Sequence, residues 1–127
     1  MLFEIAFEVL PKENRLKRNK DFEQVFKKGK GLRKDFLFLK VLKKEEESEP
    51  KFDFVVSQKI SKKAVLRNKA KRKLREIVRK RIKKIKKGVD GVLVALPGIE
   101  KKNFKELERT IIELFEKAGI IDSKPKH

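Results

Sequence analysis

The spacing of apolar residues along this chain predicts an α+β fold, in which a few helices pack on a small sheet. Apolar residues recur at three- and four-residue intervals in segments 19–28 and 62–86, and again after Asn103. Between these segments lie short runs that are apolar at nearly every position, as in buried strands. The order helix, strand, strand, helix, strand, helix fits a single domain spanning 1–127, and we expect its tail, 120–127, to be flexible.

The first half of the chain contains one predicted helix and two predicted strands. Asn19 is a suitable N-cap for a helix that ends at Gly29. The runs at 36–42 and 52–57 are rich in Phe, Leu and Val, and the polar loop between them predicts an antiparallel hairpin. Alternating apolar residues indicate one further strand within residues 1–10.

The second half begins with the longest predicted helix, from about residue 62 to about residue 86. Ser61 is a suitable cap for its start, and Gly88 ends it. One apolar stripe runs along this helix and consists of Leu66, Ala70, Leu74, Ile77, Val78 and Ile85.

A short buried strand at 92–96 and a final helix complete the predicted elements. Asn103 and Glu106 have the spacing of a capping box, in which each side chain bonds the backbone of the other residue. The helix that they open stops at Gly119.

The charge of the chain is strongly positive and unevenly distributed. Lys and Arg number 37 against 19 Asp and Glu, which gives a formal charge of +18. The segment from Lys59 to Lys87 holds 16 of these basic residues and a single acidic one, Glu76. A solvated lysine-rich helix face would carry interleaved Glu partners, which are nearly absent here. The concentration of charge therefore favours a polyanionic partner.

Several kinds of chemistry are excluded by composition. The chain has no cysteine, and its one histidine is His127, so thiolate chemistry and histidine acid–base chemistry are not expected. Ser57 and Ser61 have no histidine base to activate them, and we expect no catalytic residue in this chain. The N-terminus lacks a secretion signal and no apolar run is long enough for a membrane span, which predicts a cytoplasmic protein.

The strongest candidate site is the basic stripe on the helix at 62–86. Arg67, Lys71, Arg75 and Arg79 follow one another at four-residue spacing, and Asn68 and Arg72 lie on the adjoining row. Guanidinium groups one helical turn apart can meet successive phosphates. The side chain of Asn68 offers a donor and an acceptor for a base edge or a 2′-hydroxyl, or alternatively bonds along the helix surface.

Phe22 and Phe26 share one face of the first predicted helix. Phenylalanine rings stack on unpaired bases, but they also form protein cores. The sequence pattern alone leaves both interpretations open.

The residues Ser61, Ala64, Arg67-Asn68, Lys71-Arg72, Leu74 and Arg75 resemble the signature of the bacterial ribonuclease P protein component. The resemblance extends from about Glu13 to Gly119 and includes Asn14-Arg15-Leu16, Asp21-Phe22, Val25-Phe26 and the run from Val55 to Ile60. Lys69 stands where the family usually has Arg, which keeps the charge but loses the bidentate fork.

The resemblance implies an αβββαβα-like fold with a small mixed sheet and a left-handed βαβ crossover around the signature helix. It also implies a non-catalytic subunit of a ribonucleoprotein that removes the 5′ leader from precursor tRNA. The partners are then ribonuclease P RNA and precursor tRNA, with no membrane and no obligate protein partner. The RNA subunit carries the chemistry and holds most of the magnesium, and no organic cofactor is expected.

The resemblance assigns two groups of site residues. Those that bind RNA are Arg67, Asn68, Lys69, Lys71, Arg72, Arg75 and Arg15. Those that line a cleft for the single-stranded leader are Phe22, Phe26, Leu37, Leu39 and Ser57. Leu39 falls where an aromatic residue is common in the family, so stacking at this position is not expected.

Two other classes of nucleic-acid-binding protein fit the charge pattern. A small basic ribosomal or ribosome-assembly protein would have the same composition. A DNA-binding protein could place the helix at 62–86 in a major groove. A helix lying on a membrane surface fits least, since the apolar stripe has no Trp and other elements can cover it.

Overall fold

The computed structural model describes residues 10–122. Its elements follow one another in the order η1 (Lys12–Asn14), α2 (Asn19–Lys28), β1 (Lys30–Lys34), β2 (Leu37–Lys43), β3 (Lys51–Val55), α3 (Ala64–Arg81), η2 (Ile82–Lys84), β4 (Val89–Ala95), η3 (Ile99–Lys101) and α4 (Phe104–Ala118). The predicted strand within 1–10 lies outside the described residues except for its last position, and so does most of the tail, 123–127.

The four strands form one mixed sheet in the order β1-β2-β4-β3. The pairs β1–β2 and β2–β4 are antiparallel, whereas β3 and β4 run parallel and are joined through α3. The predicted hairpin of 36–42 with 52–57 is therefore wrong, because β4 lies between those two strands. The resemblance implies a βαβ unit around the signature helix, and β3, α3 and β4 form such a unit with parallel strands.

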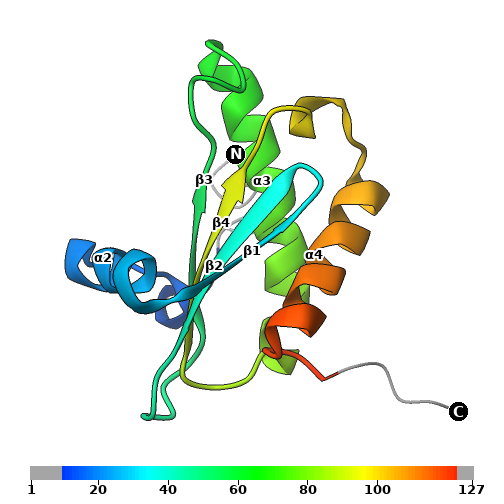
Figure 1. The fold of residues 1–127 in the computed structure, drawn as a ribbon. Helices are drawn as coiled ribbons and strands as arrows, with labels where there is room; N and C mark the ends of the chain where they lie inside the picture. The colour runs from blue at the N-terminus through cyan, green and yellow to red at the C-terminus, as the bar shows by residue number, and fades with distance from the viewer. Residues whose placement is uncertain (1–9, 123–127) are drawn as a thin grey trace, which may run out of the picture.

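Helices cover the two faces of this sheet unequally (Figure 1). Helix α2 lies against one face, where it contacts β2 and β4. Helices α3 and α4 cover the other face, and the main core fills the space between them and the sheet. We call the side that carries α2 the open face.

Two strands differ from their predicted positions for local reasons. The short edge strand β1 is absent from the prediction because Lys-Gly-Leu-Arg-Lys has no apolar pattern, and its pairing with β2 alone defines it. Strand β4 begins at Val89, three residues before its predicted start. The apolar pattern missed this extension because Asp90 and Gly91 interrupt it. Glycine is required at position 91 because a Cβ there would lie 2.5 Å from the ring of Phe52.

The predicted caps are confirmed at both ends of α4 and at the Gly29 end of α2, but not at the start of α2 or of α3. Asn103 and Glu106 form both bonds of the capping box, and Gly119 ends α4 in the left-handed conformation. Helix α2 has Arg18 rather than Asn19 as its N-cap, and the Arg18 guanidinium pairs with Asp21 instead of capping. The Ser61 hydroxyl receives the backbone N–H of Lys63 before α3 begins at Ala64.

The apolar stripe of α3 is buried only along its second half. Leu74, Ile77 and Val78 are fully buried, whereas Leu66 is 45% exposed and its neighbour Val65 is 75% exposed. The first turns of α3 extend past the end of the sheet (Figure 1). The start of α3 has no sheet beneath it, so its apolar side chains meet solvent.

This difference predicts unequal costs for the same substitution at two positions of one helix. Leu74→Ala should lower the free energy of unfolding by about 2–5 kcal/mol, because it leaves a cavity in the core. Leu66→Ala should change it by less than about 0.5 kcal/mol, because the side chain already meets solvent. Urea unfolding of both variants measures the difference, and equal losses would show that the start of α3 is packed in solution.

Candidate nucleic-acid interface

The first half of α3 presents its basic residues on two adjoining rows. Asn68, Lys69 and Arg72 are exposed on the side opposite to the buried stripe. Lys71 and Arg75 lie half-buried on one flank of the helix. Rows of this kind place cationic groups about one turn apart over two to three turns of the helix.

The basic residues in the last turn of α3, Arg79, Lys80 and Arg81, are engaged within the protein. The Arg79 guanidinium donates two hydrogen bonds to the Glu76 carboxylate, at 3.1 and 2.8 Å. The Arg81 guanidinium lies 3.0 Å from the Glu108 carboxylate of α4, and the Lys80 ammonium lies over the Phe104 ring. These contacts turn the flank with Lys80 and Arg81 toward α4, so the flank with Lys71 and Arg75 lies on the other side.

Three cations nearer the start and middle of α3 have no such partners. Among residues 10–122, no carboxylate pairs with Lys69, Lys71 or Arg75. The Arg67 guanidinium donates to the carbonyl oxygen of Ser61 at 2.9 Å, which fixes its position without neutralising its charge. Lys69, Lys71 and Arg75 therefore carry positive charge that no carboxylate among residues 10–122 neutralises.

Arg15, also predicted to bind RNA, lies apart from these residues. The backbone N–H of Leu16 bonds the carbonyl of Phe52, so this segment runs along the outer edge of β3 near its start. The side chain of Arg15 is exposed, and its Nε donates to the carbonyl of Leu10 at 2.8 Å. Arg67 lies beyond the far end of β3, so the structure does not bring the two together.

Aromatic and aliphatic side chains gather on the open face beside α2. The rings of Phe22 and Phe26 lie 5.0 Å apart, and Phe26 is 37% exposed. The sheet contributes the cross-strand row Phe38, Val94 and Val55, which are all half-buried. Phe22, Val55 and Val94 pack against the same small core under α2.

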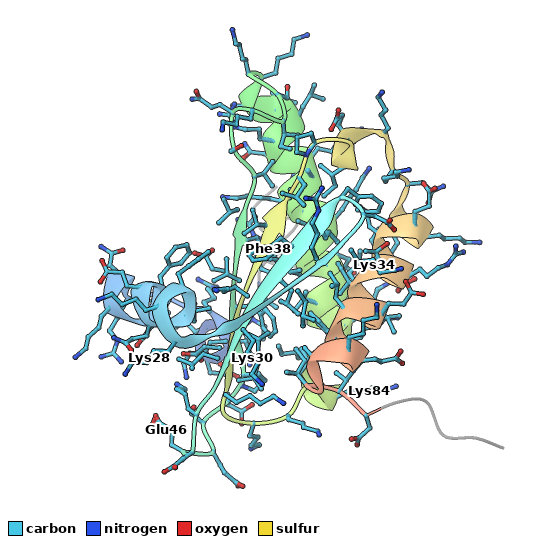
Figure 2. All side chains as sticks on the ribbon, in the orientation of Figure 1. Lys28, Lys30, Lys34, Phe38, Glu46 and Lys84 are labelled. Atoms are coloured by element: carbon cyan, nitrogen blue, oxygen red, sulfur yellow. The ribbon has the colours of Figure 1, made fainter. Side chains whose placement is uncertain are left out.

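The residues of β2 that were predicted to line the leader cleft are wrong. Leu37 and Leu39 are fully buried in the main core, on the side of α3 and α4, so they cannot contact a ligand on the open face. Phe38 lies between them and points to the opposite face (Figure 2), where its ring covers Gly31 closely. The run 36–42 is apolar on both faces, so the sequence pattern does not tell which of its residues face the core. The aromatic residue Phe38 was the one indication of which residues face a ligand.

Ser57 follows β3 on the exposed end of the open face. Its hydroxyl receives the backbone N–H of Lys59 at 3.2 Å, and the residue is exposed. The alternation along the strand places it on the same side as Val55, which is consistent with its predicted place.

One carboxylate is buried away from these surfaces. Asp90 on β4 has a side chain that is 3% exposed, with the Lys44 ammonium 3.3 Å from one oxygen and no partner for the other oxygen within residues 10–122. Burial raises the pKa of Asp90, and the Lys44 charge opposes that shift. The pair fastens the start of the β2–β3 loop to β4. Residues 10–122 hold no group of three or more His, Cys, Asp or Glu placed to bind a metal ion.

Comparison with known proteins agrees with this geometry. A family model described as Ribonuclease P matches residues 10–119. The chain is 40% identical over 113 residues to the ribonuclease P protein component of a Synechocystis species, covering 89% of this chain and 91% of that one. No helix within residues 10–122 is long and apolar enough to cross a membrane.

Solved structures show the same fold. The RNase P protein from Thermotoga maritima superposes with a TM-score of 0.72 at 29% identity, covering 82% of this chain and 96% of that chain. The Staphylococcus aureus RNase P protein, at 24% identity, has a TM-score of 0.78 over 87% of this chain and 100% of that chain, which speaks for the fold alone. This chain therefore belongs to the ribonuclease P protein family, the protein subunits of a tRNA-processing ribonucleoprotein endoribonuclease.

Proposed function

We propose that this protein binds the catalytic RNA of its ribonucleoprotein through the first half of α3 and holds the 5′ leader of precursor tRNA on the open face. The particle acts in the cytoplasm. The observation that carries the proposal is the difference in pairing along α3: Arg79 and Arg81 pair with carboxylates, whereas Lys69, Lys71 and Arg75 pair with none among residues 10–122.

Uncompensated charge on a rigid helix suits a folded RNA. Lys69, Lys71 and Arg75 can each neutralise a phosphate and release its counterions without first breaking an internal ion pair. Asn68 is exposed next to them and can bond a 2′-hydroxyl or a base edge, which phosphate contacts alone do not read.

The open face suits a single strand of varied sequence. Phe22, Phe26 and Phe38 offer rings, and every base has a face that can stack on one. Lys40 lies two residues after Phe38 on the same face of β2, and it adds a cation for the phosphate backbone of the leader. Stacking with a nearby charge gives affinity with little dependence on base identity, as the leaders of different precursors require.

The protein's contribution to cleavage is then electrostatic. A catalytic RNA must bring a polyanionic substrate and metal ions together, and a subunit of charge +18 reduces the repulsion between the two RNAs. We assign magnesium to the RNA subunit, and we assign no residue of this chain to bond cleavage.

Reconstitution tests this proposal as a whole. Added to a bacterial ribonuclease P RNA, the protein should lower the magnesium concentration that half-maximal cleavage of precursor tRNA requires, because its charge replaces part of the ionic screening. The protein alone should not cleave. An unchanged magnesium requirement, with RNA binding verified in the same samples, would contradict the proposed role.

The role of α3 can be tested with two charge-matched variants. K71Q/R75Q removes two unpaired cations, and R79Q/R81Q removes two that are paired with Glu76 and Glu108. The first should lower the slope of log affinity against log salt by about 1.5, since each phosphate contact contributes about 0.7–0.9. The second should change the slope much less. Equal changes would mean that net charge, rather than this surface, binds the RNA.

The open face predicts a difference between two substrates. Phe26→Ala should weaken binding of leader-containing tRNA by roughly 5- to 150-fold, since base stacking contributes about 1–3 kcal/mol. Binding of mature tRNA should not change. The two affinities are measured with the reconstituted particle, and mature tRNA, which lacks the leader, serves as the control substrate. Equal losses for both substrates would assign Phe26 a structural role only.

A further inference from the structure

A lysine-rimmed hollow lies at the edge of the sheet farthest from β3. It has a volume of about 380 Å³, which is within the range of small-ligand sites. Four elements supply one lysine each: Lys28 from the end of α2, Lys30 from β1, Lys43 from β2 and Lys117 from the end of α4. Figure 2 labels Lys28 and Lys30 at this place, where α2 leads into β1.

The charge of this rim is uncompensated. None of the residues that line the hollow is acidic, and no carboxylate within residues 10–122 pairs with any of the four lysines. Some lysines elsewhere do have carboxylate partners, such as Lys34 with Glu113 at 3.4 Å and Lys87 with Glu49 at 2.9 Å. Four exposed lysines around one hollow repel one another, and a bound phosphate would offset that repulsion.

The preference of lysine for the C-terminal ends of helices explains only two of these four lysines. Lys28 and Lys117 lie in the last turns of α2 and α4, where a cation favours the helix dipole. Lys30 comes from a strand and has no such role. Lys43 extends to the end of α4, with its ammonium 3.2 Å from the position that a Cβ would take at Gly119, yet no carbonyl within residues 10–122 accepts a hydrogen bond from it.

The floor of the hollow is apolar. Leu32, Val41 and Ala118 line it, and Leu32 and Ala118 are half-buried against the main core. An aliphatic floor beneath a cationic rim matches a nucleotide, whose base is flat and largely apolar and whose phosphate is anionic. Free phosphate would use the rim but not the floor.

We propose that this hollow holds an unpaired nucleotide of the RNA partner, with its phosphate among the four lysines and its base on Leu32, Val41 and Ala118. This inference rests on the proposed binding to a catalytic RNA. In the order β1-β2-β4-β3 the two edge strands are three spacings apart, or about 14 Å, and the free flank of α3 lies beyond β3. The nucleotide in the hollow is therefore separated from the RNA at α3 by the width of the sheet.

The absence of cysteine from the chain makes a direct test possible. Single-cysteine variants K30C, N68C and K105C can each carry a tethered iron chelate that cleaves nearby RNA by hydroxyl radicals. K105C is the control, because it lies on the same helix as Lys117 but about 18 Å along it. The probe is the reconstituted complex with bacterial ribonuclease P RNA.

Cleavage from position 30 at nucleotides distinct from those cut from position 68, with none from position 105, is the expected result. Cleavage from position 68 alone would overturn the second site and leave the proposed function intact. Cleavage from none of the three, in samples where the complex is shown to form, would contradict both.

Charge-matched variants provide a second readout. K30Q/K43Q removes the two cations that strands supply. It keeps Lys28 and Lys117, which favour the helix dipoles of α2 and α4. It should lower the salt slope of RNA binding by about 0.7–0.9 for the single phosphate that both lysines meet. K101Q/K105Q removes two exposed lysines outside the hollow and should leave the slope unchanged. Equal slopes in the two variants would overturn the proposal.

Discussion

Burial of Leu74, Ile77 and Val78 against the sheet holds α3 in place, and the rest of the interface depends on that anchor. The anchored half carries the basic residues that reach carboxylates, such as Arg79 with Glu76. The start of the helix extends past the sheet, and Lys69 and Lys71 there meet no carboxylate in the described part of the chain. A helix fixed at one end and charged at the other presents a rigid cationic surface without placing repulsion inside the core.

Alternate side chains along each strand of the sheet point to two different surfaces. On β2, Leu37 and Leu39 belong to the main core, while Phe38 between them belongs to the open face. A shift of one residue in register would exchange these roles, because the side-chain period of a strand is two. Burial of the leucines therefore decides which aromatic residue a bound strand can reach.

Positive charge appears at both edges of the sheet rather than on α3 alone. The first half of α3 lies at the β3 side, and the lysine-rimmed hollow lies at β1. Between them the open face carries Phe22, Phe26 and Phe38. A protein of this size with cations on two sides and rings between them can contact separate segments of RNA while remaining a rigid scaffold.

Several features were determined by the sequence itself because they are local. The capping box of Asn103 and Glu106, the end of α4 at Gly119 and the basic row from Arg67 to Arg75 depend on residues within a few turns of one another. Only the tertiary structure decided the insertion of β4 between β2 and β3, the side to which Phe38 points, and which cations keep a free charge. The hollow joins lysines from 28 to 117, so no local pattern contains it. These features arise from contacts between residues far apart in the chain, whose energies are set by packing and not by spacing along the sequence.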